Sequence, residues 1–104
     1  MSESFIYMTC ADAGEAETIG RMLVETRLAA CVNILPGMRS LYWWRGKVER
    51  AEEVVLIAKT RTDLVDELTG AVKAAHGYEV PCVVALPITG GNQDFLEWIG
   101  NETK

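Results

Sequence analysis

The sequence predicts an α+β protein with a ferredoxin-like βαββαβ antiparallel sheet, a long hairpin between the second and third strands, and a C-terminal helix. A strand–helix–strand pattern occurs twice, with the two units beginning at Phe5 and Val54. The segment 38–59 is longer than a hairpin in so small a sheet needs to be, and a further apolar helix follows the last strand. With 104 residues, the chain is expected to form a single domain over 1–104.

The first half of the chain has clear strand and helix patterns. Residues 5–10 are rich in β-branched and aromatic side chains, which predicts a strand. Asp12 and Glu15 have the spacing of a capping box, in which each side chain satisfies a free backbone N–H at a helix start. The helix that follows has an apolar face formed by Ala16, Ile19 and Leu23.

The predicted hairpin occupies the middle of the chain. Residues 31–35 form its first strand, and the Pro–Gly pair at 36–37 predicts a bulge before extended structure resumes over 39–44. Residues 45–47 have the composition of a tight turn, and 48–60 form the returning strand.

The second half repeats the pattern of the first. Another helix is expected to open at 60–63, and Gly77 is expected to end it in the left-handed conformation. Residues 81–88 form the fourth strand, and Asn92 or Asp94 begins the final helix. The apolar face of the second helix contains Leu64, Leu68, Ala71, Val72 and Ala75.

Composition excludes several classes of protein. The formal net charge of −5 and the pI near 4.8 argue against a nucleic-acid partner, because phosphates attract basic surfaces. The charge-free stretch 80–93 contains two prolines and two glycines, so no membrane association is expected. Three cysteines without C-x-x-C spacing, and an acidic start without the pattern of a secretion signal, favour the reducing cytoplasm.

The chain has more apolar surface than a monomer of this size buries easily. Hydrophobic residues make up 49% of the sequence. The hairpin segment contains Tyr42, Trp43, Trp44 and Val48, which would form an exposed apolar ribbon on a lone subunit. A homo-oligomer that covers this ribbon is therefore expected.

Three residues are candidate metal ligands. Cys10 lies at the junction of the first strand and first helix, where a copper motif would need a second thiolate three residues later. That position is occupied by Ala13, and the alternative for Cys10 is a buried core cysteine. His76 precedes Glu79 and Cys82 in a segment that also contains Tyr78. A metal could bind His76 with Glu79 or Cys82, whereas the alternative for His76 is a helix-capping role. Folding that brings Cys82 near His76 would create a Cu(I) site without C-x-x-C spacing.

Other polar and aromatic residues suggest a ligand cleft. Lys59 emerges at the end of an apolar strand stripe, where it could bind an anion, pair with Glu79 or extend into solvent. The aromatic side chains of the hairpin could stack on a ligand, but packing in a subunit interface is the favoured explanation. No nucleophile–base pair is apparent around His76, so an enzyme is not expected.

Taken in order, short motifs along nearly the whole chain resemble the CutA divalent-cation tolerance family. The matching segments are Leu28-Ala29-Ala30-Cys31-Val32-Asn33, Pro36-Gly37, Ser40-Leu41-Tyr42-Trp43-Trp44 with Gly46, Lys59-Thr60, His76-x-Tyr78-Glu79-x-Pro81, Leu86-Pro87-Ile88 and Trp98-Ile99.

The resemblance implies a ferredoxin-like homotrimer, similar in plan to PII signalling proteins, with a link to copper and other divalent cations. It implies a cytoplasmic location and cleft residues at His76, Trp44, Lys59, Tyr78 and Glu79. The chain departs from the family pattern at two positions. It has Gly77 where proline is usual and Cys82 where glutamate is usual.

Three functions remain open from the sequence. The first is a trimeric copper tolerance protein, with copper or another divalent cation bound by His76, Cys82 and Cys10 and no organic cofactor. The second is a PII-like signalling trimer that binds a small molecule in an inter-subunit cleft of Trp44, Lys59, Tyr78 and Glu79. The third is a structural trimer that binds another protein.

Overall fold

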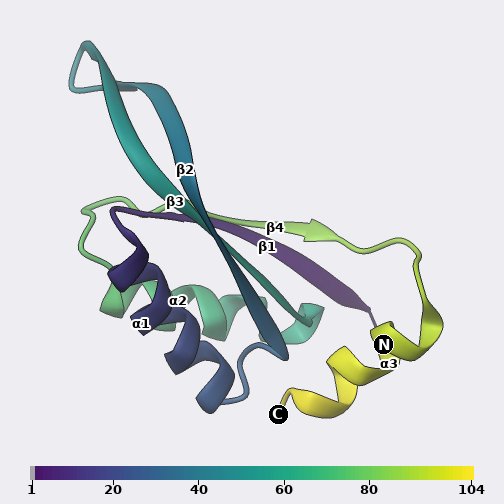
Figure 1. Ribbon diagram of the computed structural model, residues 1–104. Helices are drawn as coiled ribbons and strands as arrows, with labels where there is room; N and C mark the ends of the chain where they lie inside the picture. Colours follow the sequence, from purple (N-terminus) through teal and green to yellow (C-terminus); the bar gives the residue numbers. More distant parts are fainter. Residues whose placement is uncertain (1) are drawn as a thin grey trace.

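The computed structural model describes residues 2–104 and contains four strands and three α-helices in the predicted order. The first described residues and the C-terminus lie near the last helix, α3 (Gln93–Glu102), at the opposite end of the molecule from the hairpin tip (Figure 1). The elements are β1 (Glu3–Cys10), α1 (Ala13–Glu25), β2 (Cys31–Trp44), β3 (Lys47–Arg61), a 3-10 turn (Thr62–Leu64), α2 (Val65–Ala75), β4 (Val83–Pro87) and α3 (Gln93–Glu102).

The four strands form one antiparallel sheet in the order β2-β3-β1-β4. Helices α1 and α2 lie side by side against one face of the sheet, and α3 packs beside the beginning of β1 (Figure 1). The predicted α+β ferredoxin-like arrangement is confirmed. Over residues 2–104, no helix is both long and apolar enough to cross a membrane.

The core lies between the helices and one face of the sheet. In β1, buried and half-buried side chains alternate, because successive residues of a strand point to opposite faces. Ile6 and Met8 of β1 meet Leu56 of β3 and the buried side chains of α1. The other face of the sheet has no helix over it, and Leu35, Val84 and Leu86 stay substantially exposed there.

The capping box at the start of α1 forms much as predicted. The Asp12 carboxylate accepts a hydrogen bond from the Glu15 N–H at 2.8 Å. Glu15 reaches back and accepts from the Ala11 N–H at 2.9 Å, one residue before the capping residue. This pair fixes Glu15 beside the end of β1, which positions it for the site described below.

The predicted bulge occurs at residues 36–37 of β2. Leu35 pairs with Val55, but the next pair is Met38 with Glu53, so β2 contains one more residue than β3 across this step. Gly37 has φ +86°, a conformation that glycine adopts without the steric cost of a side chain.

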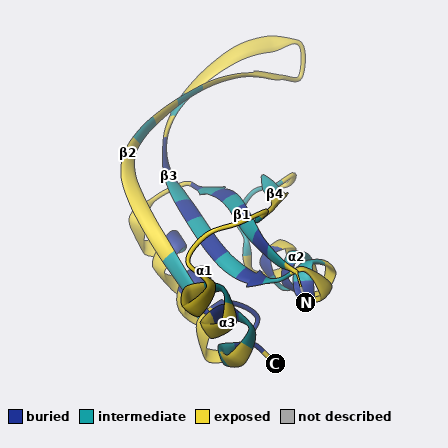
Figure 2. Ribbon diagram, turned by 90° about the vertical axis from the view of Figure 1, so that its right-hand side faces the viewer, coloured by how far each residue is buried: buried dark blue, intermediate teal, exposed yellow. Residues whose placement is uncertain are grey.

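The β2–β3 hairpin extends well beyond the rest of the sheet. Its turn has φ +51° at Arg45 and +81° at Gly46, which matches the two-residue turn that follows the twist of a hairpin. The projecting part is exposed on both strands (Figure 2). Leu41 and Trp43 are 73% and 74% exposed, which is unusual for large apolar side chains on a lone subunit.

The predicted end of the second helix is wrong in one respect. Helix α2 ends at Ala75, and the following His76 is already extended, with φ −83° and ψ 144°. Gly77 is not among the glycines with positive φ. The chain leaves the helix directly at His76 because the imidazole turns inward to a buried hydrogen-bond partner.

Candidate functional site

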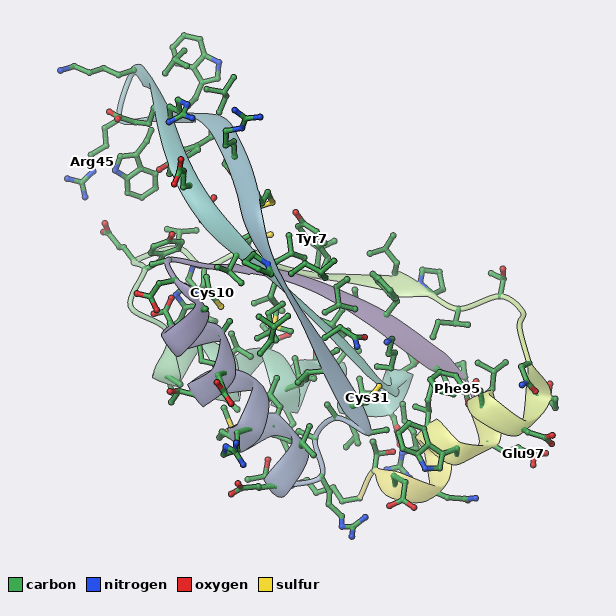
Figure 3. The ribbon with its side chains drawn as sticks, viewed as in Figure 1. Tyr7, Cys10, Cys31, Arg45, Phe95 and Glu97 are labelled. Atoms are coloured by element: carbon green, nitrogen blue, oxygen red, sulfur yellow. The ribbon has the colours of Figure 1, made fainter. Side chains whose placement is uncertain are left out.

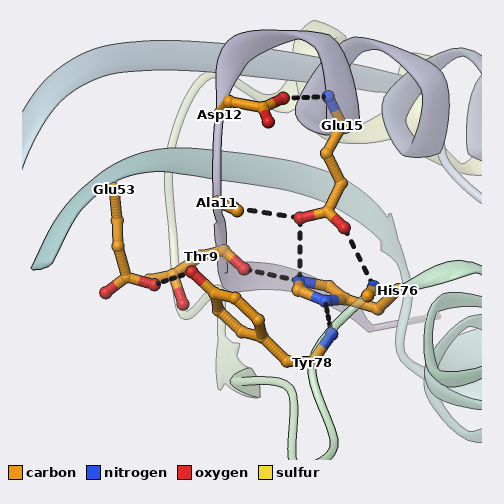
Figure 4. Close-up of polar contacts among 8 residues, drawn as sticks. Thr9, Ala11, Asp12, Glu15, Glu53, His76 and Tyr78 are labelled. Carbon is orange, nitrogen blue, oxygen red and sulfur yellow. Dashed lines mark hydrogen bonds and ion pairs between the residues drawn. The ribbon is translucent and has the colours of Figure 1, made fainter.

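Three metal-ligating side chains converge where β1, α1 and the end of α2 meet. Cys10, Glu15 and His76 place a thiol, a carboxylate and an imidazole so that their ligand atoms lie within 4.8 Å of one another. We refer to these residues as the C-E-H cluster. Figure 4 shows the polar contacts of Glu15 and His76, with Glu15 reaching down from α1 towards the imidazole.

The imidazole of His76 is fully buried, and both ring nitrogens have partners. Nδ1 accepts a hydrogen bond from the Tyr78 N–H at 3.0 Å. Nε2 lies 2.7 Å from the Thr9 carbonyl oxygen, which can only accept, so Nε2 must hold the proton. These contacts select one neutral tautomer and tie the 76–78 segment to β1.

The Glu15 carboxylate bridges α1 and the segment after α2. Oε2 accepts a hydrogen bond from the Gly77 N–H at 2.9 Å, and Oε1 lies 3.8 Å from His76 Nε2. A Cβ atom added at position 77 would lie 2.9 Å from Oε2. Glycine at this position therefore allows a close approach and supplies an N–H donor that a proline there would lack.

Cys10 is buried over its whole residue, backbone included. Burial, with a smaller effect from the negative charge of Glu15, raises the pKa of its thiol to about 11. The donor set suits a soft or borderline cation such as copper or zinc, because it combines thiolate, imidazole and carboxylate. A metal bound to all three residues through His76 Nε2 displaces the proton of Cys10, and the Nε2 proton of His76 moves to Nδ1.

A second feature is a cavity of ≈ 590 Å³ between the hairpin and the segment that follows α2. Its walls come from the end of β1, both strands of the hairpin and residues 77–82. The lining residues are Thr9, Ser40, Leu41, Tyr42, Trp44, Glu53, Gly77, Tyr78, Glu79, Val80 and Cys82.

Glu53 and Tyr78 face each other in the wall of this cavity. The Tyr78 hydroxyl donates a hydrogen bond to Glu53 Oε2 at 2.8 Å (Figure 4). Burial, and then the bond to Glu53, raise the pKa of Tyr78 well above its ordinary value. Burial is also the main reason that the pKa of the nearby Cys82 thiol is raised.

The outer rim of the cavity contains an aromatic side chain and an ion pair. Arg45 at the hairpin tip donates to Glu79 Oε2 at 2.8 Å. Its guanidinium also lies 5.3 Å from the ring centroid of Trp44, within the range of a cation–π contact. Figure 3 shows Arg45 reaching outward from the hairpin tip.

The structure places all of the predicted site residues except Lys59 either in the C-E-H cluster or in the lining of the cavity. Cys10 and His76 belong to the C-E-H cluster. Four of the others line the cavity, namely Trp44, Tyr78, Glu79 and Cys82.

Lys59 lies apart from both places. It is near the other end of β3, paired with Cys31 and Phe5, and it donates a hydrogen bond to Asn33. The ion pair considered for Glu79 is made by Arg45 instead.

Sequence reasoning missed two residues of these sites. Glu15 was identified only as a capping residue, and nothing in the local sequence shows that its second oxygen reaches the segment after α2. Glu53 lies in a run of charged hairpin residues, but it is 9% exposed while its neighbour Glu52 is exposed. A buried carboxylate beside a bulge becomes apparent only when the strand register is known.

The fold and the two sites define a class: an α+β subunit with a ferredoxin-like sheet, a projecting hairpin, and a buried cluster of metal-ligating side chains beside an acidic cavity. A family model described as "CutA1 divalent ion tolerance protein" matches residues 4–102. The chain belongs to this family.

Similar proteins come from plants, archaea and bacteria. The chain is 48% identical over 99 residues to the chloroplastic protein CutA 1 of Oryza sativa, covering 95% of this chain but only 56% of that protein. It is 48% identical over 96 residues to the divalent-cation tolerance protein CutA of Archaeoglobus fulgidus, covering 92% and 93% of the two chains.

Solved structures agree closely with this fold. The crystal structure of CutA1 from Oryza sativa has a TM-score of 0.97 at 46% identity, covering 100% of this chain and 95% of that one. The archaeal structure, described as a periplasmic divalent cation tolerance protein, has a TM-score of 0.95 at 45% identity, covering 98% and 99%.

Proposed function

We propose that this chain functions as a homotrimeric, copper-binding divalent-cation tolerance protein of the cytoplasm, in a binding role without catalysis. The observation that supports metal binding is the C-E-H cluster, in which three potential ligand atoms lie within 4.8 Å of one another. Copper fits a donor set that contains a thiolate and an imidazole better than a hard cation does. His76 is the anchor ligand of the proposal.

Metal binding at the C-E-H cluster should depend strongly on pH. The thiol of Cys10, with its pKa raised to about 11, is protonated throughout the neutral range. Each proton that the metal displaces makes the apparent affinity rise by about tenfold per pH unit. The affinity is therefore expected to increase from pH 6 to pH 8.

The test is a calorimetric titration of the metal-free protein with Cu(II) and Zn(II), and with Cu(I) by competition against a chelator. His76→Ala and Cys10→Ala are expected to reduce the copper affinity by about tenfold or more each, because each removes a ligand. Cys31→Ala is the matched control, since this thiol lies outside the C-E-H cluster. Copper binding that is unchanged in His76→Ala, or independent of pH, contradicts the proposal.

Trimer formation is supported by two exposed apolar surfaces. The face of the hairpin that contains Leu41, Trp43 and Val48 has no cover within the subunit, nor does the open face of the sheet around Val84 and Leu86. Burial of such surfaces between copies is favourable at about 25 cal/mol for each Å² removed from water. The cytoplasmic location is supported by the odd number of cysteines and the absence of C-x-x-C spacing.

A second candidate function is a PII-like response to a small molecule bound in the cavity. The volume of ≈ 590 Å³ supports it, because small-molecule sites in proteins span about 300–1,000 Å³. The walls combine aromatic surface with a few polar groups, which is the usual composition of such sites.

A further inference from the structure

The cavity beside the hairpin has an acidic lining. Glu53 and Glu79 contribute carboxylates, of which Glu79 is paired with Arg45 at the rim, and the other polar side chains are hydroxyls and one thiol. Within the described residues 2–104, no lysine, arginine or histidine lines it. The potential inside therefore favours a cation over an anion.

The size of the cavity points to an organic cation. A bare metal ion needs several ligand atoms that converge to about 2.0–2.6 Å from one point. Among residues 2–104, the converging group of this kind is the C-E-H cluster, and it contains neither Glu53, Glu79 nor Cys82. A space of ≈ 590 Å³ holds a molecule with a carbon framework.

Glu53 is the residue that would hold the charged group. It is 9% exposed, and its hydrogen bond comes from the neutral hydroxyl of Tyr78. Among the described residues, its carboxylate takes part in no ion pair. A buried carboxylate is stabilised strongly by a hydrogen-bonded cation, because charge-assisted hydrogen bonds are stronger than neutral ones.

The rim already shows how this site accommodates a cation. The guanidinium of Arg45 lies over Trp44 and donates to Glu79, so one aromatic ring and one carboxylate hold a planar organic cation there. Elsewhere in the cavity lining, Tyr42, Tyr78 and Glu53 offer the same combination of aromatic surface and carboxylate without an internal cation.

We propose that the cavity binds a small organic cation with a hydrogen-bonding head, a primary ammonium or guanidinium group, attached to an apolar body. The head donates to the carboxylate of Glu53, and the body packs against Tyr42 and Trp44. This inference rests on the second candidate function, in which the cavity is a ligand site, and names the chemistry of the ligand.

The test uses three probes in which one 2-phenylethyl group carries an ammonium, a hydroxyl or a carboxylate: 2-phenylethylamine, 2-phenylethanol and 3-phenylpropanoate. Each is titrated into the assembled protein and followed by calorimetry and by tryptophan fluorescence, since Trp44 lines the cavity. The amine is expected to bind at least about tenfold more tightly than the alcohol, and the carboxylate to bind most weakly. The N,N,N-trimethyl derivative of the amine, which has no N–H, is expected to bind more weakly than the amine.

Substitutions at two neighbouring glutamates test which carboxylate binds the cationic group of the ligand. Glu53→Gln keeps the size of the side chain and an acceptor for Tyr78, and should remove the preference for the amine. Glu52→Gln is the matched control, because this adjacent carboxylate points to the opposite face of the strand and is exposed. It should leave the affinity for the amine unchanged.

The outcomes separate this inference from the proposal on which it rests. Equal or tighter binding of the alcohol or the carboxylate overturns the preference for a cation and leaves the cavity as a ligand site. If none of the probes binds, both are overturned. If Zn(II) displaces the amine competitively and Glu53→Gln abolishes Zn(II) binding, the cavity is a metal site and the inference is wrong.

Discussion

At the scale of single residues, Cys10 couples the stability of the fold to pH. Its pKa is raised from 9.0 to about 11 by burial and by the charge of Glu15, so the folded state retains a proton that the unfolded state loses first. A raised pKa stabilises the fold fully below pH 9, and this stabilisation is lost as the pH rises towards 11.

We expect the free energy of unfolding to fall by about 1 kcal/mol between pH 8 and pH 10 because of Cys10. Urea unfolding at the two pH values measures the change. In Cys10→Val, which keeps an apolar side chain of similar size, the fall in the free energy of unfolding should be smaller by about 1 kcal/mol than in the natural sequence. Equal falls in the two proteins would mean that the thiol does not titrate differently on unfolding.

At the scale of elements, the two faces of the hairpin have different environments. Tyr42 and Trp44 lie on the face that lines the cavity, together with Glu53. Leu41 and Trp43 alternate with them, and Trp43 points away from the cavity with 74% of its surface exposed. Trp43 is therefore a better probe of assembly than Trp44, the residue that the sequence alone suggests for this test.

Replacing Trp43 with glutamate should weaken assembly, because the charge would be buried against a neighbouring subunit. Sedimentation velocity across a dilution series measures the shift towards the monomer. Arg39→Glu, which changes charge on the same face of the hairpin nearer the sheet, is the comparison and should have a smaller effect. Assembly that persists unchanged in Trp43→Glu would place this side chain outside any interface.

The elements themselves were largely predictable from the sequence. The capping residue Asp12, the bulge after Leu35 and the turn at Gly46 follow from local chemistry, and each is present. The prediction for Gly77 failed because a distant acceptor, the Thr9 carbonyl, determines the direction in which His76 leaves the helix. Local patterns do not report contacts between residues 67 positions apart.

The site was predictable only in part, for the same reason. Cys10 and His76 have recognisable ligand chemistry, but their partner Glu15 had been assigned a local role. Lys59 lies on a strand that extends into the hairpin, yet the pairing with Cys31 places it well away from the cavity. Register and tertiary packing, which the sequence does not state, decide these placements.

At the scale of the whole molecule, the subunit is elongated. Its radius of gyration is 14.1 Å, against about 13 Å for a compact domain of this length, and its longest extent is 44 Å. The projecting hairpin accounts for this shape (Figure 1). When neighbouring subunits bury part of a subunit's apolar surface, the free energy of unfolding depends on protein concentration.

We expect a species of about three times 11.5 kDa in sedimentation equilibrium at submicromolar concentration. The midpoint of thermal unfolding should rise with protein concentration, because unfolding is then coupled to dissociation. A monomer of 11.5 kDa with a midpoint independent of concentration would rule out the trimer.

The bulge at Pro36–Gly37 determines which side chains reach the cavity. Before it, the odd-numbered residues of β2 share a face with Val55 and Glu53; after it, the even-numbered residues do, including Ser40, Tyr42 and Trp44. Deleting Gly37 would reverse this alternation, turning Trp43 inward and Tyr42 and Trp44 outward. A change in the length of the hairpin therefore keeps these side chains in the cavity only when it preserves this odd–even phase, as paired insertions on both strands do.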